Sequence, residues 1–217
     1  MNRKLIIFDC DGVLIDSEVI ACRMMAEALT AEGYPISTED MVHRFVGLAA
    51  KTRQAQVERE LGHPLPHDFE AAAQCDLRAA FQHELRAMAG IADALDALRV
   101  PVCVASSSGA DRLRYTLDLV GLHGRFAGHV FSADSVAHGK PAPDLFLFAA
   151  ARMQVAPADC LVIEDSTAGV QAAVAAGMPV LGFCGGGHCP PAHAARLLAE
   201  GATAVFSTMS VLPRLVA

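Results

Sequence analysis

The fold is decided by the start of the chain, which reads Lys4-Leu5-Ile6-Ile7-Phe8-Asp9-Cys10-Asp11-Gly12. The four consecutive apolar residues before Asp9 predict a strand buried on both faces, as in a parallel sheet. Similar apolar runs recur along the chain and are separated by segments with helical spacing. This alternation predicts an α/β sheet covered by helices on both faces. The other expected strands are residues 100–105, 130–131, 161–163, 180–183 and 204–206.

A long segment after the first strand breaks this alternation. Residues 17–87 carry no strand signal, and Ser37 with Asp40 resembles a capping box at the start of a helix. At about 150 residues per domain, the chain is longer than one domain and shorter than two. We therefore expect one α/β unit interrupted by an all-helical insert. The expected helices are 17–31, 37–46, 52–61 and 69–88 in the insert, and 90–99, 110–120, 144–153, 166–176 and 191–200 outside it.

Composition and charge exclude several classes of protein. The chain has 217 residues with 17 basic and 24 acidic side chains, a net charge of −7, and its basic residues form no stripe. Non-specific nucleic-acid binding needs clustered lysine and arginine, so we expect no nucleic-acid partner. Apolar runs of 18 residues and a signal peptide are both absent from the sequence, so we expect no membrane partner. Seven scattered cysteines suit free thiols in a reducing cytoplasm.

Polar residues follow three of the expected strands where ligands gather in open α/β sheets, beyond the carboxyl ends. These are Asp9-Cys10-Asp11-Gly12, Ser106-Ser107-Ser108-Gly109 and Glu164-Asp165-Ser166. One acidic pair alone is usually a solvated turn, but two pairs at two strand ends indicate a shared site. Carboxylates that converge repel each other unless a cation is bound, and hard oxygen ligands suit Mg²⁺.

Two further features suggest chemistry. Asp9 and Asp11 are two residues apart and point the same way if the chain stays extended, so one can act as nucleophile while the other handles the proton. Gly12 permits a sharp turn there, although Asp11-Gly12 is also compatible with a plain turn. Lys140 lies between Gly139 and Pro141, where a held ammonium can clamp a phosphate, although a surface lysine is the alternative.

Together these residues resemble the haloacid dehalogenase superfamily in its phosphatase branch. Residues 9–17 are similar to its first motif, Ser106 to the second, Lys140 to the third and residues 164–169 to the fourth. The nearest subgroup is β-phosphoglucomutase-like and phosphoglycolate-phosphatase-like. Within it, the chain most resembles 6-phosphogluconate-phosphatase-like enzymes. The resemblance implies a Rossmann-like, doubly wound parallel core at residues 1–16 and 88–217, and a small helical cap at residues 17–87.

The resemblance also implies a role for each motif residue. Asp9 would attack phosphorus and form an aspartyl phosphate, and Asp11 would protonate the leaving oxygen and then activate water. The phosphoryl group would be bound by Ser106, Ser107 and Lys140. Mg²⁺ would be held by Asp9, the main-chain carbonyl of Asp11, Asp165 and Glu164. The implied activity is a Mg²⁺-dependent phosphatase for a small phosphorylated metabolite, with a sugar phosphate as the expected substrate class. The resemblance leaves the oligomeric state open and is compatible with a monomer.

Residues at a few positions distinguish this activity from others on the same fold. The dehalogenase and phosphonoacetaldehyde hydrolase branches lack an acid at the position of Asp11. A β-phosphoglucomutase has a histidine, a lysine and an arginine where this chain has Ala21, Val46 and Ala50. These differences favour hydrolysis over phosphotransfer between sugar positions, which stays the alternative. A non-catalytic ligand-binding protein is the third hypothesis. The complete set of motifs disfavours it, because such a protein has no need of Asp11 or Lys140.

Two loops are weaker candidates. Gly185–Cys189 could bring His188 to a substrate, or it could be an ordinary glycine-rich surface loop. In the insert, Gly47, Lys51 and Arg53 are candidates for substrate specificity, because a cap that closes over a phosphorylated substrate needs positive charge. The alternative for the charged pair is a solvated helix face.

Overall fold

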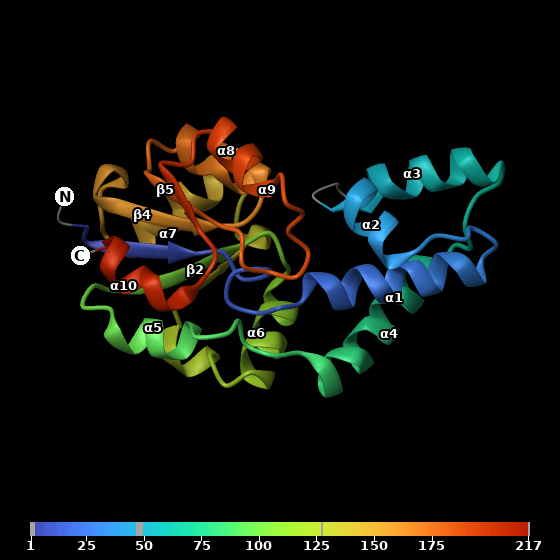
Figure 1. The fold of residues 1–217 in the computed structure, drawn as a ribbon, viewed down its shortest axis with the longest axis horizontal. Coiled ribbons are helices and arrows are strands. Elements are labelled where there is room, and N and C mark those ends of the chain that lie inside the picture. The colour runs from blue at the N-terminus through green and yellow to red at the C-terminus, as the bar shows by residue number, and fades with distance from the viewer. Residues whose placement is uncertain (1–2, 47–49, 127, 217) are drawn as a thin grey trace. The chain divides into compact units, whose positions relative to one another are not determined.

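The computed structural model describes residues 3–46, 50–126 and 128–216. The chain divides into two compact units, Met1–Asp16 with Arg86–Ala217 and Ser17–Leu85. Figure 1 shows the first as a sheet with surrounding helices and the second as helices alone. Within the described residues, no helix is long and apolar enough to cross a membrane.

The α/β unit is built on one sheet of six parallel strands in the order β3-β2-β1-β4-β5-β6. This confirms the expected parallel α/β architecture, with the opening strand in the middle. The strands are β1 (Leu5–Phe8), β2 (Val102–Ser106), β3 (Val130–Ser132), β4 (Cys160–Glu164), β5 (Val180–Phe183) and β6 (Ala204–Phe206). Every residue of β1 is fully buried, as a central strand between two helical layers requires.

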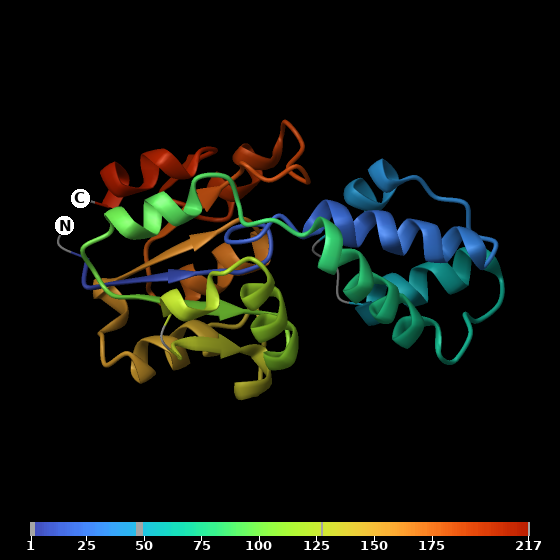
Figure 2. The same cartoon turned by 90° about the horizontal axis from the view of Figure 1, so that it is seen from below.

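Helices pack on both faces of this sheet. Leu5 and Ile7 belong to a core that includes residues of α7, α8 and α9. Ile6 and Phe8 point to the opposite face, where the Phe8 and Phe126 rings meet edge to face. Figure 2 shows α5 and α10 together on one side of the strands. The helices are α5 (Ile91–Ala97), α6 (Ala110–Leu119), α7 (Asp144–Arg152), α8 (Thr167–Ala175), α9 (His193–Ala199) and α10 (Leu212–Val216).

The second unit consists of four helices around their own apolar core. The Ser37 hydroxyl accepts from the main-chain N–H of Asp40 at 3.0 Å, as the capping pattern predicted. The same hydroxyl donates to the Asp40 carboxylate at 2.6 Å, so the cap is closed by the two side chains. The helices are α1 (Glu18–Ala31), α2 (Thr38–Phe45), α3 (Ala50–Leu61) and α4 (Phe69–Glu84).

The ends of several elements differ from the sequence expectation. Helix α4 was expected to run to Met88, but it ends at Glu84, and Leu85 is extended. The chain leaves the helix because it pairs with the segment after β1: Ala87 bridges Ile15, and the Met88 N–H donates to the Leu14 carbonyl. Helix α10 and four short 3-10 segments lack the length for a periodic signal and were not expected. These are η1 (His123–Phe126), η2 (Ala133–Ser135), η3 (Pro157–Asp159) and η4 (Met209–Val211).

Candidate active site

The strand register brings the candidate residues to one edge of the sheet. Phe8, the last residue of β1, pairs with Val104 of β2 and Ile163 of β4. Because all three strands run the same way, Asp9 and Glu164 come next along adjacent strands, and Ser106 ends β2 on the other side of β1. Residues far apart in the sequence therefore meet at the carboxyl ends of the central strands.

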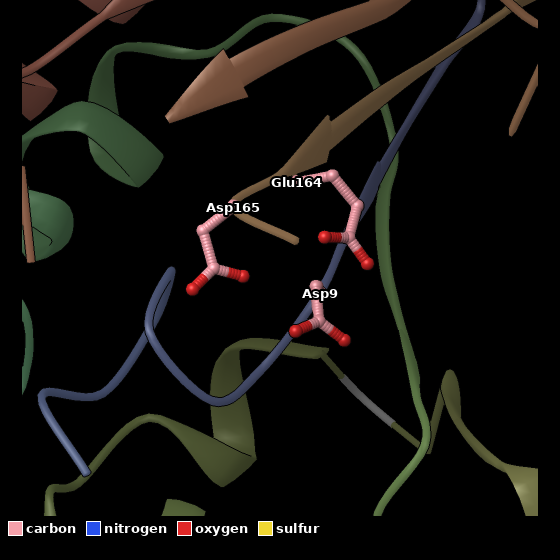
Figure 3. A group of neighbouring side chains, drawn as sticks. All are labelled: Asp9, Glu164 and Asp165. Atoms are coloured by element: carbon pink, nitrogen blue, oxygen red, sulfur yellow. The ribbon is translucent and has the colours of Figure 1, made fainter. Parts of the chain in front are cut away.

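Three buried carboxylates gather at this edge: Asp9, Glu164 and Asp165 (Figure 3). Each offers an oxygen within 4.8 Å of the others, which is the geometry of a shared cation site. Burial raises the pKa of Asp9; Lys140 opposes this, and the charges of Glu164 and Asp165 add to it. The cluster therefore requires positive charge to stay ionised.

Lys140 supplies part of that charge. Its ammonium donates to Asp9 Oδ1 at 2.7 Å and to Glu164 Oε1 at 2.6 Å, and its side chain is only 4% exposed. Burial by itself disfavours the ammonium, but the charges of Asp9 and Glu164 and these hydrogen bonds raise the Lys140 pKa above its usual value. The structure thus rejects the alternative of a surface-loop lysine.

Glu164 is held at both oxygens. Its Oε2 accepts from the main-chain N–H of Ser166 at 2.7 Å and from the Ser166 hydroxyl at 2.9 Å, while Oε1 accepts from Lys140. The Ser166 hydroxyl in turn accepts from the Gly169 N–H and caps α8. Gly169 has no alternative here, because a Cβ would lie 1.7 Å from Glu164 Oε1. Ser166 and Gly169 therefore fix the orientation of the carboxylate.

Asp11 has a different environment from the acidic cluster. Its Oδ2 accepts from the Ser108 hydroxyl at 2.6 Å, and its Oδ1 accepts from Arg112 at 2.9 Å. The Asp11 side chain is 14% exposed, so it lies at the rim of the site and not within the buried group. Gly12 takes the left-handed φ of +78°, and a Cβ there would lie 2.0 Å from Asp165 Oδ2. The turn at Gly12 therefore needs glycine both for its backbone and for space.

The serines after β2 differ in accessibility. Ser106 is buried, and its hydroxyl accepts from the main-chain N–H of Ser108 at 3.1 Å. Ser107 is exposed. Of the predicted phosphate-binding residues, Lys140 contacts Asp9 directly, and Ser106 ends the strand next to β1. Ser107 lies at the surface.

Asp165 is held by two histidines from the segment after β5. His188 Nε2 lies 2.8 Å from Asp165 Oδ2, and His193 Nε2 contacts the main-chain carbonyl of Asp165. Both rings are buried. Burial opposes a charged imidazole at His188, but the hydrogen bond to Asp165 leads the interactions that raise its pKa. The alternative of an ordinary surface loop at Gly185–Cys189 is therefore wrong, because His188 is buried against Asp165.

The specificity candidates lie in the helical unit. Arg53 forms an ion pair with Glu70 at 3.2 Å, so its charge is already matched within that unit. Lys51 is exposed on α3, and with Arg59 it lines a shallow pocket of the same helix. Gly47 lies outside the described residues. A role for these residues in specificity stays a prediction.

The donor set at the sheet edge fits a divalent cation. Asp9 and Glu164 share the Lys140 ammonium, and Asp165 contacts His188, so three buried carboxylates outnumber the two side chains that can carry positive charge against them. Carboxylate oxygens are the ligands that hard cations such as Mg²⁺ prefer. The residues that would hold it are Asp9 and Asp165, with Glu164 beside them.

The parallel sheet, with buried carboxylates and a lysine at the carboxyl ends of its central strands, defines an α/β protein with an acidic site at the edge of its sheet. The match to known families is specific: residues 3–177 match the haloacid dehalogenase-like hydrolases. The chain belongs to that family, as the motifs predicted.

Its relatives agree with this assignment. The chain is 30% identical to the 6-phosphogluconate phosphatase of Escherichia coli, over 99% of this chain and 96% of that protein. A haloacid dehalogenase-like protein of unknown function from Agrobacterium tumefaciens is 43% identical, with a TM-score of 0.91 over 99% and 97% of the two chains. A family hydrolase from Deinococcus radiodurans, solved with bound phosphate and sodium, is 32% identical, with a TM-score of 0.83 over 97% and 93%. The chain is thus a phosphoric monoester hydrolase by family.

Several residues at the site were not singled out from the sequence. Ser108, Arg112 and His193 carry no strong signal, because ordinary turns and helices contain the same residue types. The signal for Arg112 is its place in the first turn of the helix that follows the serine-rich turn. Their contacts with Asp11 and Asp165 form only when the segments after separate strands are brought together.

Proposed function

We propose that this protein is a Mg²⁺-dependent phosphatase that hydrolyses a small phosphorylated metabolite through an aspartyl phosphate on Asp9. The observation that carries the proposal is the position of Lys140. Its ammonium joins Asp9 and Glu164 at the edge of the sheet, in direct hydrogen bonds to both. A buried aspartate held this way is oriented by the ammonium, which also offsets part of its negative charge, as attack on a phosphoryl group demands.

In the first step, a carboxylate oxygen of Asp9 attacks phosphorus, and the bond from phosphorus to the ester oxygen breaks. Asp11 gives its proton to that leaving oxygen, so the alcohol departs neutral. Ser108 and Arg112 orient Asp11 at the rim of the site, because each donates a hydrogen bond to one of its carboxyl oxygens. The product of the step is the phosphoryl group on Asp9.

In the second step, the Asp11 carboxylate takes a proton from water, and the water oxygen attacks phosphorus. The acyl phosphate bond breaks, which frees phosphate and restores the Asp9 carboxylate and the protonated Asp11. Lys140 and the Ser106 hydroxyl stabilise the phosphoryl charge throughout. Mg²⁺, held by Asp9, Asp165 and the Asp11 main-chain carbonyl with Glu164 nearby, would supply further positive charge against the phosphoryl oxygens.

We propose a sugar phosphate as the substrate class, with the α/β unit as the catalytic core and the helical unit as its cap. The relative named 6-phosphogluconate phosphatase supports this class, because it aligns along nearly the whole chain. The exposed Lys51 is available to contact a substrate, whereas Arg53 is engaged by Glu70. The free thiols of all seven cysteines suit a reducing cytoplasm.

The test is the turnover of an aryl phosphate with Mg²⁺ by Asp9→Asn and by a control, Asp159→Asn. Asp159 pairs with the exposed Lys4, away from the cluster, so its variant should keep full activity. Asp9→Asn should lose turnover while its far-UV circular dichroism stays that of the wild type. In the wild type, rapid acid quenching and mass spectrometry should find a phosphoryl group on the peptide that contains Asp9.

Undiminished turnover by Asp9→Asn would overturn the assignment of the nucleophile. Conversion of a β-sugar 1-phosphate to its 6-phosphate, without free phosphate, would assign phosphotransfer in place of hydrolysis. A screen of phosphorylated metabolites with Mg²⁺ would identify the substrate, and release of phosphate from none of them would favour a ligand-binding protein.

A further inference from the structure

We propose that His188 is a positioning residue, which fixes the carboxylate of Asp165 so that one of its oxygens is presented to the divalent cation. This inference rests on the proposed function, because it concerns the cation that the phosphatase would use. It assigns a role to the glycine-rich loop Gly185–Cys189, which the four sequence motifs do not include.

The contact itself is direct and buried. His188 Nε2 lies 2.8 Å from Asp165 Oδ2, and the exposed fractions of the two side chains are 2% and 7%. A carboxylate oxygen only accepts, so Nε2 carries the hydrogen and donates it. A buried hydrogen bond to a charged group is costly to lose, because water cannot replace the missing partner. His188 Nδ1 is also buried and has no hydrogen-bond partner among the residues that the structure describes. Nε2 also lies 3.5 Å from the Cys189 thiol, a weak hydrogen-bonding group, so the shorter contact with the Asp165 carboxylate sets the ring's orientation.

The surrounding backbone is shaped to admit the imidazole. A Cβ on Gly186 would lie 2.5 Å from His188 Cε1, and a Cβ on Gly12 would lie 2.9 Å from the same atom. The ring thus lies against two glycines, one from its own loop and one from the turn after Asp11. A larger residue at either position would displace the ring or Asp165, so glycine at both positions leaves the space that the imidazole needs beside Asp165.

Asp165 is restrained at its main chain as well. His193 Nε2 donates to the Asp165 carbonyl, which is an acceptor only. Figure 3 shows one carboxylate oxygen of Asp165 directed toward Glu164 and Asp9 and the other directed away. With Oδ2 bound by His188, we assign Oδ1 to the cation. Residues that hydrogen-bond to a metal ligand generally set its orientation, and their loss lowers metal affinity by about 10-fold to 100-fold.

The experiment measures Mg²⁺ binding by isothermal titration calorimetry on the full chain. The variants are His188→Leu, which keeps the bulk and removes the donor, and His188→Gln, whose amide can donate from the position of Nε2. His129→Leu is the matched control, because His129 is exposed in the same unit. We expect the dissociation constant to rise about 10-fold to 100-fold in His188→Leu, and to stay near wild type in His188→Gln and in the control.

A second readout separates positioning from general damage. At saturating Mg²⁺, His188→Leu should regain turnover of an aryl phosphate, with a KM for that substrate near the wild-type value. Should the leucine variant fail to fold, His188→Asn takes its place, because its amide is polar but too short to reach Asp165.

The outcomes distinguish this inference from the proposed function. Equal Mg²⁺ affinity in folded His188→Leu and wild type, with an active wild type, would overturn the role of His188 alone. Loss of affinity in His188→Gln to the same extent as in His188→Leu would also overturn it, because the donor would then be irrelevant. A wild type that neither binds Mg²⁺ nor releases phosphate would overturn both proposals.

Discussion

Gly169→Ala is the substitution whose effect can be worked out most directly from the structure. The added Cβ would lie 1.7 Å from Glu164 Oε1, 1.9 Å from Cδ and 2.5 Å from Oε2, whereas ordinary contact begins near 3.4 Å. Glu164 is fully buried and its carboxylate is held by Lys140 and Ser166. The carboxylate can make room only if it gives up these hydrogen bonds.

The magnitude follows from what is broken. Disrupting a buried ion pair costs about 3–5 kcal/mol, and alanine returns at most about 1 kcal/mol through its better helix propensity. We therefore expect Gly169→Ala to lower the free energy of unfolding by about 2–4 kcal/mol. Lys140 would also lose one of the two carboxylates that orient it beside Asp9. A displacement on the order of 1 Å at a reacting group can reduce turnover about 100-fold.

The assay is urea unfolding followed by far-UV circular dichroism, because the chain has no tryptophan to report by fluorescence. Gly124→Ala is the control, since nothing lies within 4 Å of a Cβ at that position and its backbone is not left-handed. Turnover of an aryl phosphate is measured on the same samples. Ordinary surface substitutions change the free energy of unfolding by no more than about 0.5 kcal/mol. If the free energy of unfolding of Gly169→Ala lies within that range of the wild-type value, and the variant keeps full turnover, the reasoning is refuted.

Two further changes test the charge balance. Lys140→Met leaves Asp9 and Glu164 without their shared ammonium, so in EDTA it should lower the free energy of unfolding by about 3–5 kcal/mol. Added Mg²⁺ should recover part of this loss. A variant as stable in EDTA as the wild type would contradict the prediction. In the helical unit, the Tyr34 hydroxyl, and then Arg44 and Gln56, lower the pKa of Glu60 to about 2 from 4.5. The stability that Glu60 contributes is complete above pH 4.5 and is lost as the pH falls toward 2. Thermal unfolding of wild type and Glu60→Gln should therefore converge over that range, and parallel curves would contradict the assignment.

The central part of the fold follows from local sequence. Leu5–Phe8 and the runs at 180–183 and 204–206 form strands with the predicted bounds, because runs this short between polar ends are typical of strands buried in a parallel sheet. The order of the motifs predicted the family. Since parallel strands end at one edge, it also followed that Asp9, Ser106 and Glu164 would lie near one another.

The ends of helices were harder to predict from local sequence. The Ala-rich pattern of α4 continues past Glu84, and helix propensity offers no reason to stop there. The chain leaves the helix because Ala87 and Met88 pair with residues after β1, which are 72 to 74 positions away in the sequence. A local pattern cannot contain a pairing of that range.

The sequence by itself determined the parallel sheet, the helical insert and the identity of the acidic residues, because hydrophobic periodicity and strand-end chemistry are local properties. The tertiary structure alone decided which side chains hold those acids in place. Arg112 meets Asp11, and His188 meets Asp165, only because loops after different strands converge. Their partners depend on register, on loop direction and on the space left by Gly12 and Gly186, which exist only once the sheet has formed.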